Sequence, residues 1–167
     1  MKRLILAFSS LVLFATVCSA PAVADTFDFS FNGPSGFGSG EFTASATSTP
    51  GEYRITGVSG TTDGFAINSL LAPGTYPSTP DQNDNDLFYP ALGGQHFDFG
   101  GVSYSLSNHT DINLFSFEGG YWVDTNNDGG VELNSLAVSA TPEPESLVLL
   151  GTGLLGLYGM ARRRFAA

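Results

Sequence analysis

The residue pattern with the clearest chemical meaning is the acidic segment 124–132, which reads DTNNDGGVE. It matches D-x-N-x-D-G-x-x-E, in which nearby oxygen-bearing side chains turn inward as calcium ligands and Gly129 permits a sharp turn. An EF-hand would place glutamate at its twelfth position, where Ser135 stands, so a shorter loop is the calcium hypothesis. Its ligands would be Asp124, Asn126, Asp128 and Glu132.

The same segment is also good turn material, because Asn, Asp and Gly accept the positive φ that tight hairpins need. A plain hairpin between the strand-like stretches YWVD and VELNSLAV is therefore the interpretation that we favour. Calcium is kept as the alternative.

A second acidic cluster occupies residues 81–86, with three carboxylates within DQNDND. Pro80 and Pro90 flank it, so we expect an exposed, solvated loop, with calcium as the alternative way to relieve charge repulsion. The chain has two histidines, His96 and His109. On a strand, His96 and Asp98 would share a face, but zinc needs a third ligand nearby, so both histidines are predicted to be ordinary surface or core residues.

The common catalytic motifs are missing from the sequence: a G-x-S-x-G elbow, a phosphate loop, H-E-x-x-H and a dinucleotide fingerprint. The segment 25–140 has neither lysine nor cysteine, which excludes Schiff-base and thiol catalysis there. A carboxylate pair for glycoside hydrolysis stays open, since its members meet only in the fold. No pair is singled out, so we predict no catalytic residue and a non-enzymatic protein, with a small secreted hydrolase as a minor alternative.

Charge is distributed unevenly along the 167 residues, whose formal net charge is −10. The segment 25–140 holds 14 acidic side chains and a single basic one, Arg54, for a net charge of −13. Binding to nucleic-acid phosphates or to anionic lipid depends on clustered Lys and Arg. This segment is therefore excluded from both roles.

The N-terminus has the three parts of a secretory signal peptide over residues 1–24. Lys2 and Arg3 are the charged start, an apolar run follows over 4–17, and Ala22-Val23-Ala24 has the small-x-small form of a cleavage site. Cleavage between Ala24 and Asp25 would remove Cys18, the single cysteine. The exported protein would then have no thiol or disulfide chemistry.

The C-terminus, residues 141–167, is also tripartite. Pro142-Glu143-Pro144 fixes an extended backbone suited to an enzyme cleft. Residues 147–161 carry no charge and would form a helix of about 22 Å, somewhat short of a ~30 Å bilayer core. The basic triplet that follows is a stop-transfer signal for the cytoplasmic side: Arg162, Arg163 and Arg164.

These three parts, in this order at the end of a protein with a signal peptide, resemble the PEP-CTERM sorting signal that exosortases recognise. The resemblance implies export, a precursor transiently tethered to the inner membrane, and processing by an exosortase near Pro142 to Pro144. It implies delivery to the cell surface or into exopolysaccharide, and it says nothing of the activity of residues 25–140.

Between the two ends, the sequence alternates with the period of strands. TFDFSF sets Phe27, Phe29 and Phe31 on one face, and a loop NGPSGFGSG is expected over 32–40. EYRITGV sets Tyr53, Ile55 and Gly57 against Arg54, Thr56 and Val58. Further strands are expected at EFTASAT, FAINSLL, QHFDF, VSYSLS, INLFSF, YWVD and VELNSLAVS.

Short strands separated by Gly, Asn and Asp predict an all-β domain over 25–140, an antiparallel sandwich or a barrel-like fold. The stretches EYRITGVSGTTDGFAINSLLAPGTY, NDNDLFYP and HFDFGGVSYSL are similar to a recurrent small cargo type among PEP-CTERM proteins. That cargo type has no assigned activity, so the resemblance implies no mechanism.

We therefore predict an exported, non-enzymatic surface or extracellular-matrix protein that is sorted by exosortase and associated with exopolysaccharide. The alternative is a polysaccharide-binding module, with or without calcium assistance. Its stacking faces would come from aromatic side chains. The candidates are Tyr76, Tyr89, Tyr104, Tyr121 and Trp122.

Overall fold

The computed structural model describes residues 25–76, 82–141 and 151–153. Ten strands form in this part of the chain, and their pairings are antiparallel. They are β1 (Asp25–Gly33), β2 (Gly36–Ala46), β3 (Glu52–Thr62), β4 (Phe65–Leu70), β5 (Asp86–Phe88), β6 (Val102–Leu106), β7 (Asp111–Phe117), β8 (Gly120–Thr125), β9 (Val131–Glu132) and β10 (Ser135–Ala140).

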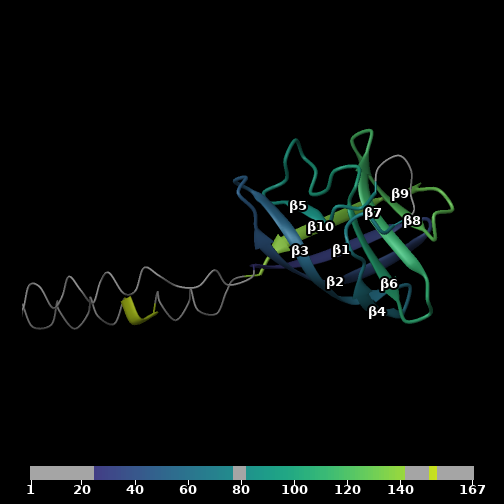
Figure 1. Cartoon of the computed structure of the whole chain (residues 1–167), viewed down its shortest axis with the longest axis horizontal. Helices are drawn as coiled ribbons and strands as arrows, with labels where there is room; N and C mark the ends of the chain where they lie inside the picture. Colours follow the sequence, from purple (N-terminus) through teal and green to yellow (C-terminus); the bar gives the residue numbers. More distant parts are fainter. Residues whose placement is uncertain (1–24, 77–81, 142–150, 154–167) are drawn as a thin grey trace, which may run out of the picture.

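The strands make one sheet in the order β10-β1-β2-β3-β4-β6-β7-β8-β9, with β5 paired to β3 beside that path. This sheet curls into a half-barrel (Figure 1). The predicted all-β antiparallel class is confirmed, and of the two predicted architectures the barrel-like one describes the curled sheet.

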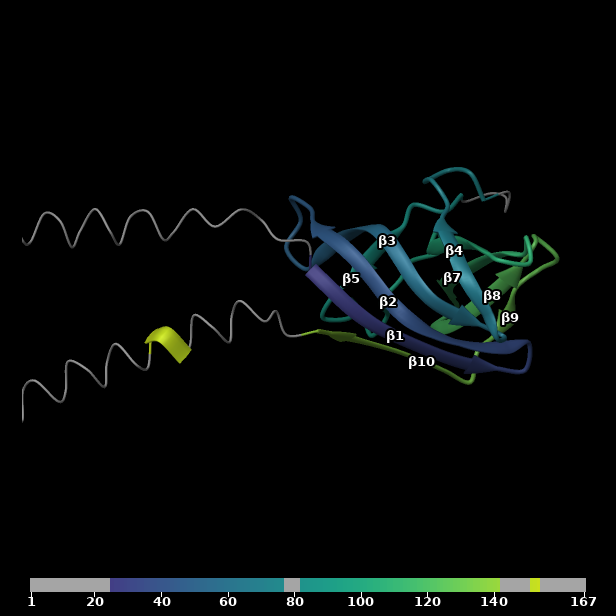
Figure 2. The same cartoon turned by 90° about the horizontal axis from the view of Figure 1, so that it is seen from below.

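The two ends of the strand order meet at one corner of the half-barrel. β9 and β10 lie at opposite ends of the order, yet only Leu133 and Asn134 separate them in sequence. The Leu133 N–H donates to Tyr121 O at 2.8 Å, and the Asn134 N–H donates to Asn32 O at 2.9 Å. The chain thus crosses from β8 to β1, and β10 runs back along β1 (Figure 2).

Aromatic side chains of β1 form the centre of the core. Phe27, Phe29 and Phe31 are 1%, 3% and 4% exposed, which confirms the predicted inward face of this strand. Phe29 stacks on Phe42 of β2 with ring centroids 4.1 Å apart. Burying such a ring stabilises the fold by about 2–3 kcal/mol. The remaining core side chains are Ala44, Ile55, Leu87, Phe97, Val102, Tyr104, Leu106, Ile112, Leu114, Val123 and Leu133.

The prediction of a loop over residues 32–40 is wrong, because only Pro34 and Ser35 lie between β1 and β2. Gly38 and Gly40 are strand residues, and each is glycine for a packing reason. A Cβ at Gly38 would overlap the ring of Phe31, and a Cβ at Gly40 would overlap the carbonyl oxygen of Ser59 on β3. Here glycine allows close approach within the sheet and does not mark a loop.

The alternation predicted for EYRITGV fails at a β-bulge. The register of β2 against β3 shifts between Thr43 and Ala44, so that Thr43 faces Gly57 while Ala44 faces Ile55. The extra residue, Thr56, changes the side on which the following residues point. Val58 therefore packs against the core together with Ile55, although the sequence predicts opposite faces for them.

Two other predicted strands differ from the structure. QHFDF is irregular: Phe97 enters the core, while the Asp98 carboxylate accepts the Gly100 N–H at 2.9 Å and bends the chain. VELNSLAVS is two strands, β9 and β10, because Leu133 is buried and Asn134 crosses to β1.

The predicted signal peptide, residues 1–24, lies outside the described residues, as does most of the predicted apolar helix 147–161. In the part of the chain that the structure describes, we find no helix with the length and apolar character needed to cross a membrane.

The close approach of β2 and β3 predicts a sharp difference between two glycine substitutions. Gly40→Ala should lower the free energy of unfolding by about 3 kcal/mol or more, because the new Cβ meets backbone that cannot move aside. Gly57→Ala is the matched control, since its Cβ would lie 3.6 Å from Thr43 Cβ, an ordinary contact. Urea unfolding of the full-length chain in detergent, followed by its single tryptophan, measures both. Equal losses would contradict the close-approach argument.

Candidate functional site

The segment 82–86 lies against the curled sheet and is not a solvated loop, so the sequence prediction for this cluster is wrong. Asn83 and Asn85 are 1% and 0% exposed, while Asp84 and Asp86 alternate with them and stay partly exposed. Asp81 lies outside the described residues. The period-two spacing of Asn and Asp was the available signal, since it places the amides on one face and the carboxylates on the other.

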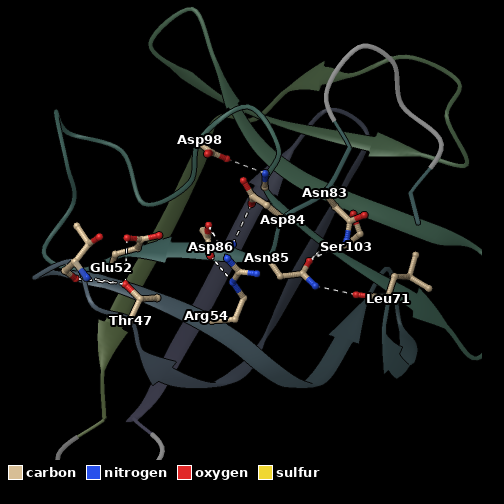
Figure 3. A network of polar contacts seen from close by, with 12 residues as sticks. Thr47, Glu52, Arg54, Leu71, Asn83, Asp84, Asn85, Asp86, Asp98 and Ser103 are labelled. Atoms are coloured by element: carbon tan, nitrogen blue, oxygen red, sulfur yellow. Dashed lines mark hydrogen bonds and ion pairs between the residues drawn. The ribbon is translucent and has the colours of Figure 1, made fainter. Parts of the chain in front are cut away.

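Asn85 is the centre of a buried hydrogen-bond network (Figure 3). Its Nδ2 donates to Leu71 O at 2.8 Å. Its Oδ1 accepts from Asn83 Nδ2 at 3.0 Å and from the Ser103 N–H at 3.2 Å. Ser103 Oγ in turn donates to Asn113 Oδ1 on β7 at 3.0 Å. These side chains join the segment before β5 to β6, which pairs with β7 in the sheet.

Asn83 fastens the loop 71–76 to the same network. Its Oδ1 accepts the N–H groups of Thr75 and Tyr76, at 3.1 and 2.9 Å. Its Nδ2 also donates to Ala72 O at 3.1 Å. One buried side chain therefore satisfies three backbone groups of a loop that has no strand partner of its own.

Three carboxylates lie on the other side of this segment, and each has a different partner. Asp86 pairs with Arg54 through Nε–Oδ1 at 2.5 Å and Nη2–Oδ2 at 3.2 Å. Burial nevertheless raises the pKa of Asp86, although Arg54 opposes the shift. Asp98 accepts the N–H groups of Gly100 and Gly101 at 2.9 and 3.1 Å. Asp84 Oδ1 accepts the Asp86 N–H at 3.1 Å, and Figure 3 shows the Asp84 and Asp98 side chains beside each other.

Burial, together with the charges of Asp98 and Asp86, raises the pKa of Asp84 to about 7. A protonated carboxyl beside an ionised one resembles an acid–base pair in its electrostatics.

The predicted calcium ligands lie in and beside the turn that joins β8 to β9. Asp124 is 5% exposed, and its Oδ1 accepts the Gly129 N–H at 3.2 Å. The nearby Tyr76 hydroxyl accepts the Asn127 N–H at 3.1 Å, and burial together with the charge of Asp124 raises the pKa of Tyr76. Asn126 Oδ1 accepts the Asp111 N–H at 2.8 Å, while the predicted ligands Asp128 and Glu132 are exposed.

The segment therefore makes the predicted hairpin, since Trp122 pairs with Glu132 and Val123 with Val131. Two of the four predicted ligands, Asp124 and Asn126, already accept backbone N–H groups. Among the described residues there is no cluster of three or more His, Cys, Asp or Glu side chains that could hold a metal ion. Calcium binding stays a prediction. A bound calcium ion would have to compete with backbone N–H groups for the side-chain oxygens of Asp124 and Asn126.

The histidines lie apart from each other. His96 lies between the rings of Tyr89 and Tyr121, nearly parallel to both, at centroid distances of 6.0 and 6.4 Å. Its Nδ1 contacts Phe88 O at 3.0 Å. His109 is exposed in the turn between β6 and β7.

Aromatic side chains on β7, on β8 and in the turn 98–101 before β6 form a surface that we call the aromatic patch. It consists of Phe99, Phe115, Phe117 and Trp122. Phe99 contacts Phe115 and Phe117 at centroid distances of 5.7 and 5.5 Å, and Phe117 contacts Trp122 at 5.7 Å. Phe99 and Phe117 are 37% and 40% exposed. The patch is thus an apolar surface that the fold leaves in contact with solvent.

Sequence reasoning found only one member of this patch. Of the predicted stacking aromatics, Tyr76 and Tyr104 are fully buried, so they offer no face to a ligand. Tyr89 and Tyr121 are half-buried beside His96, and Trp122 belongs to the patch. The missed signal was the alternation in INLFSF, which places Phe115 and Phe117 opposite the buried Leu114 and Ser116.

The buried amide network predicts a large effect of Asn85→Gly. Glycine accepts the φ of +61° at this position, so the substitution removes the amide without backbone strain. Leu71 O and the Ser103 N–H lose their side-chain partner, at about 1–3 kcal/mol each, and Asn83 Nδ2 keeps only its bond to Ala72 O. We expect thermal unfolding to show a loss of at least about 3 kcal/mol.

Asn127→Gly is the matched control for this prediction, because Asn127 has the same φ of +61° but is exposed. It should change stability by less than about 0.5 kcal/mol. Similar losses in the two variants would mean that the amide hydrogen bonds contribute little.

The remaining predicted site residues lie outside the described part of the chain: Ala22, Ala24, Pro142, Glu143, Pro144, Arg162, Arg163 and Arg164. Comparison with known proteins bears on the C-terminal set. Residues 140–164 match the family model of the PEP-CTERM protein-sorting motif. Neither the curated proteins nor the solved structures contain a match to the chain. The C-terminal segment of the chain thus carries a PEP-CTERM protein-sorting motif.

Proposed function

We propose that this chain is an exported, non-enzymatic surface or extracellular-matrix protein that exosortase processes near Pro142 to Pro144 and that associates with exopolysaccharide. The observation that carries the proposal is the sorting motif at residues 140–164. It begins at Ala140, the last residue of β10, so the motif starts where the folded domain ends. A processing enzyme could then act on the tail without entering the sheet.

The topology of the precursor follows from the charges of the tail. Arg162 to Arg164 follow the uncharged stretch 147–161 and, by the positive-inside rule, would stay on the cytoplasmic side. Under this proposal the stretch 147–161 is a transient transmembrane helix, and the acidic domain lies outside the inner membrane. Cleavage near the Pro-Glu-Pro motif would release the domain from this tether.

The composition of the domain suits an extracellular location. Between Asp25 and Ala140 it has no cysteine, so an oxidising environment cannot cross-link it through disulfides. Its net charge of −13 keeps it from anionic surfaces and favours solubility.

Polysaccharide binding is the second candidate function, and the aromatic patch favours it. Aromatic rings offer flat apolar faces on which the C–H faces of sugars can stack. Phe99 and Phe117 are exposed, and the acidic side chains of Asp98, Glu118 and Glu132 neighbour patch residues in sequence or across strands. Carboxylates accept hydrogen bonds from sugar hydroxyls, and their charge favours a neutral polysaccharide over one rich in uronic acids.

Replacing Pro142, Glu143 and Pro144 by alanine tests the sorting proposal. Export should stay intact, because the signal peptide is unchanged, but processing should stop and the larger, membrane-bound form should accumulate. Cell fractionation and immunoblotting compare it with the parent, and the matched control replaces Thr141 and Ser146, which flank the Pro-Glu-Pro core, by alanine. Release of the triple variant as readily as the parent would refute the proposal.

The second proposal predicts that Phe117→Ala weakens binding to neutral exopolysaccharide by about 2- to 10-fold, since an aromatic contact contributes about 0.5–1.5 kcal/mol. The matched control is Phe65→Ala, because Phe65 is 44% exposed on β4 and lies outside the patch. Binding of the full-length chain in detergent is followed by the fluorescence of Trp122, with calcium, with magnesium and with neither. Equal affinities of the two variants would exclude the patch.

The calcium arm of the same experiment tests the predicted metal loop. If calcium assists, it should strengthen binding more than magnesium does, and Asp128→Asn should remove that difference. An equal effect of the two ions, or a calcium effect that survives in Asp128→Asn, would leave the segment 124–132 as a hairpin turn only.

A further inference from the structure

The carboxyl groups of Asp84 and Asp98 both lie at Gly100: Asp98 Oδ1 accepts the Gly100 N–H at 2.9 Å, and a Cβ on Gly100 would lie 2.8 Å from Asp84 Oδ2. Two ionised carboxylates so placed repel each other, and they can share a hydrogen bond only while one of them is protonated, because a carboxylate has no hydrogen to donate. The two residues come from segments that are distant in sequence, the stretch before β5 and the turn before β6. In Figure 3 they face each other across the gap between these segments.

The surroundings place the shared proton on Asp84. Asp98 Oδ1 already accepts two backbone N–H groups, from Gly100 and Gly101, whereas burial raises the pKa of Asp84. Asp84 Oδ1 accepts the Asp86 N–H at 3.1 Å, and a Cβ at Gly100 would lie 2.8 Å from Asp84 Oδ2. The packing against Gly100 keeps water from part of the Asp84 carboxyl group.

The charged groups around Asp84 are acidic, apart from one guanidinium that is already paired. Asp86 and Asp98 both act on Asp84 electrostatically. Arg54 is engaged by Asp86, and Glu52 lies near enough to act on Asp86. An ionised Asp84 would therefore face two other carboxylates without a cation of its own.

The contact between the two segments extends beyond the carboxyl pair. The Asn85 N–H donates to Gly101 O at 2.9 Å, which ties the segment 82–86 to the turn 98–101. Asn83 and Asn85 then carry this connection to Leu71, Thr75 and Ser103. A change in the carboxyl pair can therefore act on the loop 71–76 and on the start of β6.

We propose that Asp84 and Asp98 form a pH-sensitive latch, closed while they share a proton and loosened when both carboxyl groups are ionised. In the closed state the segment 82–86 lies on the turn 98–101. In the loosened state charge repulsion separates the two segments, and the amides of Asn85 and Ser103 exchange with solvent more often.

The direction of the pH effect follows from the pKa of Asp84, which burial raises to about 7. The folded state holds this proton more tightly than the unfolded state, in which an aspartate has a pKa of about 3.9. The stabilising contribution is therefore complete below about pH 4 and is lost as the pH rises to about 7. The latch is closed in mildly acidic surroundings and loosened above neutrality.

Hydrogen–deuterium exchange of the full-length chain in detergent at pH 5.5 and pH 8.5 tests the latch. After correction for the intrinsic pH dependence of exchange, protection of Asn85 and Ser103 should fall by about 5- to 30-fold at pH 8.5. Protection of β1, which lies away from the latch, should not change. An unchanged protection of Asn85 and Ser103 in the parent would overturn the proposal.

Two variants separate the latch from other groups that titrate in this range. Asp84→Asn places an amide donor opposite Asp98, and Asp98→Asn places one opposite Asp84 while keeping an acceptor for Gly100 and Gly101. Each variant retains the bond at both pH values, so the loss of protection should be abolished in both. His96 and His109 are present in both variants, so a pH response that persists would belong to the histidines and refute the latch. If one variant fails to fold, the other variant still tests the latch.

Discussion

Every buried backbone N–H and C=O group needs a hydrogen-bond partner, since an unpaired one costs about 1–3 kcal/mol. A curled sheet with a gap in its ladder must meet this requirement without a strand. Here the gap lies beside β5 and β6, and the amides of Asn83 and Asn85 fill it by bonding to Leu71, Tyr76 and Ser103 among others. A side-chain amide offers two N–H donors and an acceptor oxygen, whereas a hydroxyl offers a single donor and an ionised carboxylate offers none.

This use of Asn83 and Asn85 also decides where the neighbouring charges lie. Because the amides point inward, the alternating Asp84 and Asp86 point to the other side of the same segment. Asp86 meets the guanidinium of Arg54, the single basic side chain among the 14 acidic ones of the domain. No second cation is left for Asp84, so in the proposed latch a proton shared with Asp98 takes that role. The proposed sensitivity to pH would thus be a consequence of an extremely acidic composition and a buried amide network.

The sequence predicted those features that depend on local periodicity. Phe27, Phe29 and Phe31 alternate without interruption, and their strand forms as expected. Prediction failed where contacts between distant segments determine the structure. Gly40 was predicted to lie in a loop, but it is a strand residue that is glycine because β3 packs closely against it. The bulge at Thr56 follows from the register between two strands, which a single strand does not reveal. The sorting motif was predictable because its parts are contiguous, whereas the aromatic patch joins Phe99 to residues on two later strands.

The ends of the domain explain how a processed tail and a stable sheet can coexist in one chain. The Thr141 N–H donates to Thr26 O at 2.9 Å, so the first and last residues of the domain lie side by side. β10 is held by six residue pairs with β1, from Phe27 with Ala140 to Asn32 with Ser135. All of these contacts lie before Pro142, where the Pro-Glu-Pro motif begins. Cleavage within or beyond that motif would therefore leave the last strand and its partner intact. Under the proposed sorting route, release from the membrane would not change the fold of the domain.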